Sequence, residues 1–154
     1  MRGFMPSPLS LPPPAAREDV PLPSMLLANY HQLDPHAFGP RQIELLKLAA
    51  TNPAVARIFV NPLIKAAVCR SLLGSTPAER AWIRPIRPWF GHAAHFHVRL
   101  HCAASSPDCQ EQKPPPPADG CGTELASWLH HLPPPPPEDR VHPCRCCPRP
   151  AIGS

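Results

Sequence analysis

The sequence predicts an α+β fold in which helices pack on a small antiparallel sheet. The first observation is the segment from His95 to His101, where polar and apolar residues alternate strictly, as in a half-buried β-strand. The second is that neighbouring segments carry apolar residues at helical spacing, each behind a residue that favours a helix start. We expect this strand to be central in the sheet. The helices should pack on or near its apolar face, which consists of Phe96, Val98 and Leu100.

Proline content limits how much of the chain can be compact. The chain has 154 residues, of which 27 are proline, and many of these lie near the start, at 114–117 and after residue 132. Proline fixes φ and lacks the N–H donor, so such runs form extended segments rather than a packed core. We therefore predict an irregular segment over 1–23, a compact region over 24–132 and a disordered tail over 133–154. The tail also contains three cysteines without an assigned role: Cys144, Cys146 and Cys147.

The first elements of the compact region follow in order. Pro40 suits the first turn of a helix over 40–50, which Pro53 keeps from continuing. The β-branched residues of 55–60 predict a short buried strand. Asn61 is then an expected N-cap for a second helix, over 62–73.

Three further elements follow the second helix. Thr76 and Glu79 form a capping-box pattern, which predicts a short third helix. Prolines interrupt 84–88, so we expect a loop or an edge segment there. Thr123 is the expected cap of a last helix over 123–132, whose apolar face comprises Leu125, Trp128, Leu129 and Leu132.

Charge and hydropathy exclude several classes of partner. The net charge is +4, and the chain has neither a long basic run nor a basic patch interleaved with aromatic residues. Nucleic acid is therefore not an expected partner. The sequence also lacks an apolar run long enough to span a membrane. A mild positive bias fits an anionic polymer but does not select one.

Histidines cluster on the polar face of the predicted strand. His95 and His97 should lie about 6–7 Å apart on that face, and His92 lies just upstream. Imidazole is the commonest metal ligand and a good general base near neutral pH. The pattern favours a zinc site with an attached base, although a polar strand face also accommodates histidines that have no such role. Catalytic zinc requires three protein ligands and an open position.

The segment 87–99, RPWFGHAAHFHVR, resembles the second signature of the penicillin-insensitive murein endopeptidases. These are zinc metallopeptidases related to the D-Ala-D-Ala metallopeptidases and the lysostaphin-type enzymes. The similarity extends to 57–65 and to 119–128, and covers about residues 20 to 132. It corresponds to the C-terminal half of such an enzyme.

The resemblance implies a role for each histidine. His97 matches a zinc ligand, His95 matches the catalytic histidine that acts with a zinc-activated water, and His92 matches a supporting histidine. The implied substrate is the peptidoglycan cross-link between D-alanine and meso-diaminopimelate. Arg87 and Arg99 are candidates to pair with a substrate carboxylate, with solvated arginines as the alternative.

The resemblance also implies two disulfides, Cys69–Cys121 and Cys102–Cys109, and a periplasmic location. The residues alone indicate disulfides in an oxidising compartment, without fixing the pairing, and leave free buried thiols as the alternative. The family is exported, yet the first residues are followed by prolines instead of the apolar stretch of a signal peptide. We therefore expect a truncated chain, with the family's remaining His and Asp zinc ligands encoded before Met1.

Three functions are compatible with these features. The first is a zinc endopeptidase in truncated form, and the second is a non-catalytic peptidoglycan-binding remnant of the same fold. The third is a proline- and histidine-rich protein that binds metal and partners, which would need neither the strict alternation nor the capped helices. With one matched zinc ligand, we expect the chain by itself to bind zinc weakly and not to cleave muropeptides at a useful rate.

Overall fold

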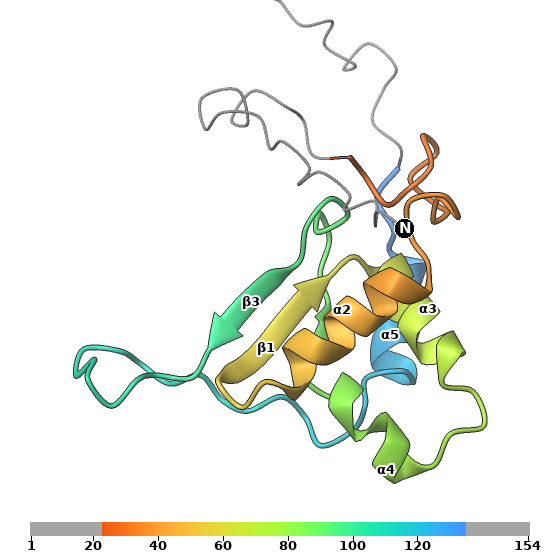
Figure 1. Ribbon diagram of the computed structural model, residues 1–154. Helices are drawn as coiled ribbons and strands as arrows, with labels where there is room; N and C mark the ends of the chain where they lie inside the picture. The colour runs from red at the N-terminus through yellow and green to blue at the C-terminus, as the bar shows by residue number, and fades with distance from the viewer. Residues whose placement is uncertain (1–22, 135–154) are drawn as a thin grey trace, which may run out of the picture.

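A computed structural model describes residues 23–134 (Figure 1). This part of the chain contains helices and one small mixed sheet, which confirms the α+β class. The elements are α2 (Pro40–Thr51), β1 (Val55–Val60), α3 (Pro62–Ser71), α4 (Pro77–Arg80), the 3-10 helix η1 (Ala81–Ile83), β2 (Ile86–Pro88), β3 (His97–Leu100) and α5 (Thr123–His130). No helix within 23–134 is long and apolar enough to cross a bilayer. The irregular 1–23 segment and the tail with its three cysteines fall almost wholly outside the described residues.

The sheet has the order β2-β1-β3, so β1 is its central strand. β3 pairs with β1 in antiparallel orientation, whereas β2 pairs with it in parallel. The predicted all-antiparallel sheet with a central 95–101 strand was therefore wrong on both points. The physical reason is that the chain between β1 and β2 contains α3, α4 and η1, which is long enough for the crossover that a parallel pair needs.

Most element boundaries follow the sequence signals. β1 has the predicted bounds, and α2 is one residue longer than predicted. Asn61 caps α3, because its side-chain oxygen accepts a hydrogen bond from the Leu63 N–H at 2.9 Å. Thr76 and Glu79 form the expected capping box. α5 differs: Gly122 is its N-cap, and Thr123 already belongs to the first turn.

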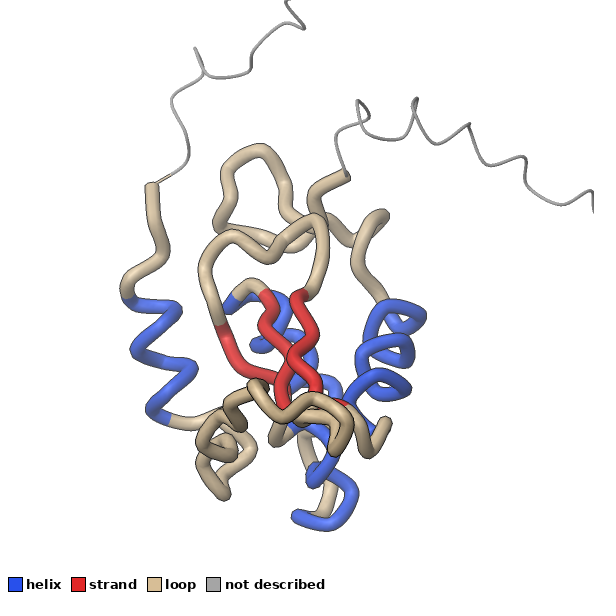
Figure 2. Tube along the Cα trace, turned by 90° about the vertical axis from the view of Figure 1, so that its left-hand side faces the viewer, coloured by secondary structure: helices blue, strands red, loops and turns tan. Residues whose placement is uncertain are grey.

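The core lies on the face of β1 that α2 covers. Ile58 and Val60 project into it and have exposed fractions of 0% and 1%. Figure 2 shows helices to either side of the strands. Phe96 and Val98 pack against this core as predicted, but Leu100 is 63% exposed. Leu100 lies opposite Val55, at the end of the sheet where the register is irregular, so the apolar face of β3 ends before it.

Both disulfides implied by the resemblance are present. Cys69 in α3 is bonded to Cys121, just before α5, with 5.8 Å between their Cα atoms. Cys102 is bonded to Cys109, with 5.7 Å between Cα atoms, and this bond closes the loop that leaves the body of the protein after β3 (Figure 1). One bond therefore joins two helical regions, and the other constrains a local loop.

Residues 113–119, here called the strap, are an extended segment that holds basic side chains through its backbone carbonyls. Arg57 donates to the carbonyl of Lys113 at 2.9 Å, and Arg84 donates to those of Pro115 and Pro116. Further donors come from Arg87 and from Lys65. Four consecutive prolines in the strap, 114–117, lack N–H groups and keep it extended.

Candidate active site

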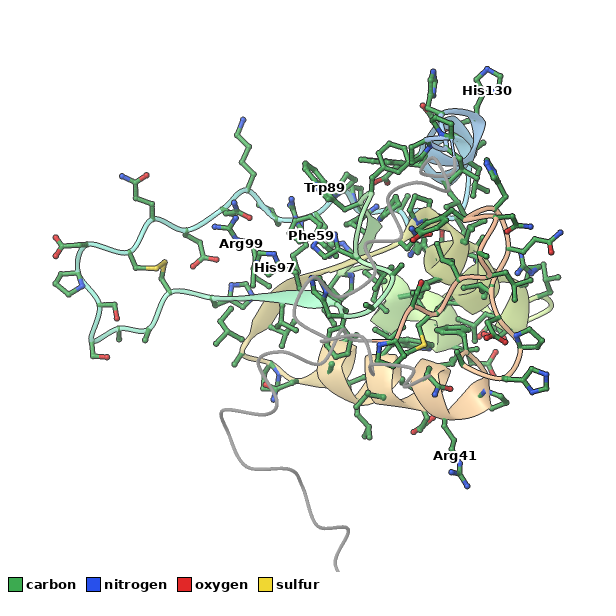
Figure 3. The ribbon with its side chains drawn as sticks, turned by 90° about the horizontal axis from the view of Figure 1, so that it is seen from above. Arg41, Phe59, Trp89, His97, Arg99 and His130 are labelled. Carbon is green, nitrogen blue, oxygen red and sulfur yellow. A yellow bond between two sulfur atoms is a disulfide. The ribbon has the colours of Figure 1, made fainter. Side chains whose placement is uncertain are left out.

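The sheet face opposite Ile58 and Val60, here called the outer face, carries the predicted polar residues. Because successive residues of a strand point to opposite faces, β1 contributes Arg57 and Phe59, and β3 contributes His97 and Arg99. Register places Arg57 opposite Arg99 and Phe59 opposite His97. Figure 3 shows Arg99, His97, Phe59 and Trp89 in a row along this face, with α2 on the other side.

The three histidines singled out by sequence lie together beside Phe59. The ring centroids of His92 and His95 are 5.2 Å apart, and those of His92 and His97 are 6.0 Å apart with the rings stacked. The His97 ring also contacts Phe59 edge-on, at 5.7 Å between centroids. His95 precedes β3 and is exposed, like His97. The structure therefore gathers all three imidazoles in one place.

His92 is held by backbone contacts on both sides. Its ring Nδ1 is 3.0 Å from the carbonyl oxygen of Phe90, so Nδ1 carries the proton as donor and Nε2 is the remaining nitrogen. Its own carbonyl accepts a hydrogen bond from the Asn61 N–H at 3.0 Å. Because Asn61 caps α3, this bond ties the backbone at His92 to the start of that helix.

The described residues supply only part of the ligand set that a metal ion needs. Within residues 23–134, no group of three or more His, Cys, Asp or Glu side chains is arranged to hold a metal ion. The imidazoles that are present have the right chemistry for zinc, and the backbone bond of His92 is of the kind that orients a metal-site histidine. The described residues thus fit one side of a zinc site.

The three histidines line two different hollows. One, of about 460 Å³, lies on the outer face and is lined by Arg57, Phe59, Trp89, His92, His97, Arg99 and Gln112. The other, of about 290 Å³, is mostly apolar and is lined in part by Phe38, Leu46, Ala93, His95 and Phe96. His92 and His97 line the first hollow and His95 lines the second.

Aromatic residues extend the outer face towards α5. Trp89 is 52% exposed, and its ring centroid lies 5.5 Å from that of Phe59 and 5.7 Å from that of Trp128. The Phe90 ring also contacts Trp128, with 4.7 Å between ring centroids. Sequence reasoning placed Trp128 on the apolar face of the last helix but did not connect it with the histidine segment. The contact joins residues far apart in the chain, and no local pattern reveals it.

Arg87 does not fit its predicted substrate contact. It lies in β2 and is 4% exposed. Its guanidinium donates to Glu124 at 2.6 Å and to the carbonyls of Pro116 and Ala118 in the strap. Burial lowers the pKa of Arg87, and the carboxylate of Glu124 opposes that effect. These contacts make Arg87 part of the framework that holds the strap.

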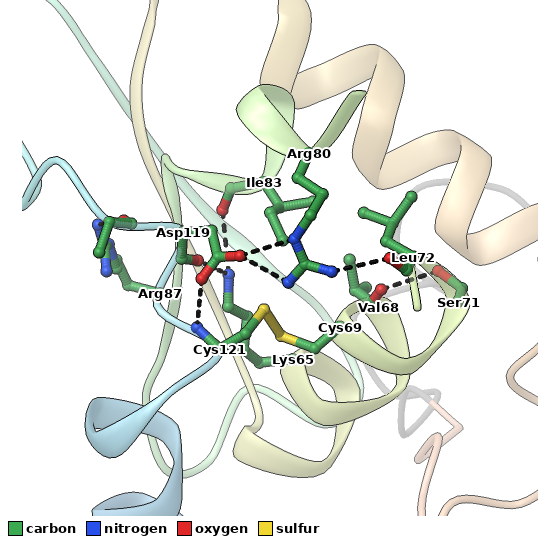
Figure 4. A network of polar contacts seen from close by, with 11 residues as sticks. Lys65, Val68, Cys69, Ser71, Leu72, Arg80, Ile83, Arg87, Asp119 and Cys121 are labelled. Atoms are coloured by element: carbon green, nitrogen blue, oxygen red, sulfur yellow. Dashed lines mark hydrogen bonds and ion pairs between the residues drawn. A yellow bond between two sulfur atoms is a disulfide. The ribbon is translucent and has the colours of Figure 1, made fainter. Parts of the chain in front are cut away.

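Lys65 is a buried residue that sequence reasoning missed. Its side chain is fully buried, and Nζ donates to the carbonyls of Ile83, at 3.0 Å, and of Asp119, at 2.6 Å (Figure 4). Burial, together with the charge of nearby Arg87, lowers the pKa of Lys65 to about 8. The available signal was its place one turn before Cys69, on the buried face of α3.

Arg80 and Asp119 complete this framework. Two guanidinium nitrogens of Arg80 lie 2.9 and 2.6 Å from one carboxylate oxygen of Asp119. Burial alone would raise the pKa of Asp119, but hydrogen bonds from the Cys121 N–H and from Arg80 outweigh it and lower the pKa. Figure 4 shows these contacts beside the Cys69–Cys121 disulfide. The end of the strap is thus tied to α3 and α4 by both covalent and ionic contacts.

Comparison with known proteins gives a consistent result. Residues 9–150 match the family described as penicillin-insensitive murein endopeptidase. Proteins of that name from Klebsiella pneumoniae subsp. pneumoniae and Yersinia enterocolitica are 50% identical over 95 residues and 47% identical over 105 residues. These alignments cover 62% and 68% of this chain, but 33% and 37% of the relatives. A protein of the same name from Pectobacterium atrosepticum is 48% identical over 97 residues, which are 63% of this chain and 33% of the relative. The chain spans about a third of the length of the curated relatives it matches.

Proposed function

This chain belongs to the penicillin-insensitive murein endopeptidase family, and on that premise we propose that its outer face is one side of the active site of a zinc-dependent peptidoglycan hydrolase. The observation that carries the proposal is the contact of the His92 ring with the rings of both His95 and His97, of which His92 and His97 line the outer-face hollow. The substrate we propose is the cross-link between D-alanine and meso-diaminopimelate in peptidoglycan.

Each histidine has a role that its surroundings support. His97 is the proposed zinc ligand, because its strand position presents an exposed imidazole on the outer face. A zinc ion bound there would supply Lewis-acid activation of water and of the scissile carbonyl. His95 is the proposed catalytic base, since it is exposed and its ring contacts that of His92. His92, held by the Phe90 carbonyl, orients its neighbours.

The surroundings support the same proposal. Arg99 lines the histidine hollow and is exposed, so it is the arginine we assign to substrate, in place of Arg87. The two disulfides favour an oxidising compartment, and we propose the periplasm, where a peptidoglycan hydrolase meets its substrate.

Zinc titration and muropeptide hydrolysis test the function. We expect residues 1–154 alone to bind zinc weakly and to leave cross-linked muropeptides uncut. A chimera that supplies the remainder of the Klebsiella relative should gain one tightly bound zinc and should hydrolyse the cross-link. In that chimera, His97→Ala should abolish zinc binding and turnover, whereas His95→Ala should spare binding and abolish turnover.

His130→Ala is the matched control, because His130 is an exposed histidine on α5, away from the row of Figure 3. It should change neither zinc binding nor turnover. A folded chimera that binds muropeptides without cutting them would contradict the enzyme and favour a peptidoglycan-binding protein. Tight, stoichiometric zinc on residues 1–154 alone would show that this chain holds ligands not assigned above.

A further inference from the structure

Two arginines face each other on the outer face without an acidic partner. Arg57 in β1 is paired in register with Arg99 in β3, and residues directly opposite on antiparallel strands have Cβ atoms about 5 Å apart. Like charges in this arrangement destabilise a sheet. Within residues 23–134, no carboxylate forms an ion pair with either arginine. The described structure therefore leaves this pair of charges without compensation.

The arginine pair adjoins the histidines. Arg57, Arg99 and His97 line the same hollow. Arg99 is the next outward-facing residue after His97 along β3, which is a step of about 6–7 Å. Arg57 is held in place, because it donates to the Lys113 carbonyl at 2.9 Å and lies over the Phe59 ring at 5.9 Å. A guanidinium has five N–H groups, so this tether leaves donors for a ligand.

We propose that Arg57 and Arg99 together bind the free carboxylate that adjoins the scissile bond of the substrate. This inference rests on the proposed endopeptidase function. In a cross-link between D-alanine and meso-diaminopimelate, the carbon attached to the scissile nitrogen carries a carboxylate. A substrate whose scissile bond lies at His97 can present that carboxylate to the next outward position of the strand, where the arginines lie.

The site selects the acid over its amide. Guanidinium groups bind carboxylates through paired, charge-assisted hydrogen bonds, and two arginines supply the charge to hold one strongly. An amidated diaminopimelate has no negative charge and cannot relieve the repulsion between Arg57 and Arg99. The pair is thus a specificity determinant for cross-links whose diaminopimelate is not amidated.

Calorimetric titration of residues 1–154 tests the inference with two ligands. One is the dipeptide D-alanyl-meso-diaminopimelate, and the other is the same dipeptide with the carboxylate next to the peptide nitrogen amidated. The acid should bind about 10- to 100-fold more tightly than the amide, as expected for charge-assisted hydrogen bonds. Arg99→Gln and Arg57→Gln should each abolish most of this preference. Arg41→Gln, the same charge change on the opposite side of the protein in Figure 3, should preserve it.

The Arg99 variant decides the outcome. Substitution of Arg57 also removes its bond to Lys113, whereas the Arg99 side chain has no hydrogen bond to the described part of the chain. Thermal unfolding of each variant reports whether the fold is intact. Equal binding of acid and amide, or equal losses in Arg41→Gln and Arg99→Gln, would overturn the carboxylate site and leave the endopeptidase proposal standing. Binding of neither dipeptide would also overturn the site, whereas the turnover assay of the chimera decides the endopeptidase function on its own.

Discussion

Arg87 and Arg99 project from the same face of one small sheet, from its two edge strands, but their surroundings are opposite. Arg87 is 4% exposed and is surrounded by Glu124 and by carbonyls of the strap. Arg99 is exposed, stands opposite a second arginine and shares a hollow with histidines. Within the described residues, Arg87 therefore has an acidic partner, whereas Arg99 has none.

The difference follows from the cost of burial. A guanidinium that leaves water without a partner is strongly unfavourable, so a buried arginine requires an acid and acceptors of its own. An exposed arginine stays hydrated at little cost and remains available to a ligand. The buried end therefore serves the fold, whereas the open end is where substrate recognition is expected. Four substitutions or conditions test this division, and their expected effects on stability decrease in the order given.

Loss of the Cys69–Cys121 bond should have the largest effect. The bond spans a sequence separation of 52 residues, and a loop of that length corresponds to about 4 kcal/mol of stability. Urea unfolding of a Cys69→Ser/Cys121→Ser double variant measures it. The Cys102→Ser/Cys109→Ser pair is the control, with a separation of 7 residues in an exposed loop, and it should cost less. A larger loss of stability in the control would mean that the Cys69–Cys121 bond stabilises the fold less than the Cys102–Cys109 bond does.

Alkaline pH should stabilise the fold through Lys65. Its folded pKa is about 8 and its ordinary value is 10.5. Between these values the unfolded chain binds more protons than the folded one at Lys65, so the contribution of Lys65 to stability is constant below about pH 8 and rises towards pH 10.5. A difference of this size corresponds to about 3 kcal/mol.

Urea unfolding at pH 8 and pH 10.5 of the natural chain and of Lys65→Met isolates this contribution. The variant should lack the rise seen in the natural chain. Identical pH profiles for the two proteins would show that Lys65 retains an ordinary pKa and that this part of the framework is hydrated.

Removal of the acid beside Arg87 should have an intermediate effect. Glu124→Gln leaves the buried guanidinium without a counter-charge. We expect a loss of about 2 kcal/mol, below the usual cost of breaking a fully buried pair, because the Glu124 side chain is 38% exposed. Thermal unfolding measures it, with Glu44→Gln, an exposed residue of α2, as the control. An unchanged melting temperature would contradict a structural role for Arg87.

Removal of the charge at the open end should have the smallest effect. Arg99→Gln relieves the repulsion from Arg57, and we expect stability to change by less than about 0.5 kcal/mol, in the favourable direction. The same thermal unfolding experiment measures it. A marked loss of stability would mean that Arg99 has an internal partner and, like Arg87, contributes to the fold.

Local patterns predicted the elements better than their arrangement. The β-branched run of 55–60 and the cap at Asn61 identified β1 and the start of α3, because propensity and capping act within a few residues. The alternation placed His97 and Arg99 on one face of β3 for the same reason, but His95 lies before the strand and lines a different hollow. The parallel pairing of β2 escaped prediction, because the strand has three residues and its position depends on the crossover through α3 and α4.

The interaction partners of the buried charged residues could not be predicted from the sequence either. Arg87 looked available for substrate, since nothing near it in sequence indicates that Glu124 and the strap cover it. Nothing near Lys65 in the sequence indicates that the carbonyls of Ile83 and Asp119 satisfy its buried ammonium group. Such assignments require contacts between residues far apart in the chain, which periodicity cannot supply.

The strap recognises its partners through carbonyl oxygens, and this has a consequence for how the segment can vary. Every residue has a backbone carbonyl, so the bonds to Arg57, Arg84 and Arg87 do not depend on which side chains the strap carries. What must persist is the extended backbone, which prolines 114–117 already favour before folding. The exposed residues beside the prolines, Lys113 and Ala118, can therefore vary while the arginines cannot, and engineered labels or new side chains are best introduced there.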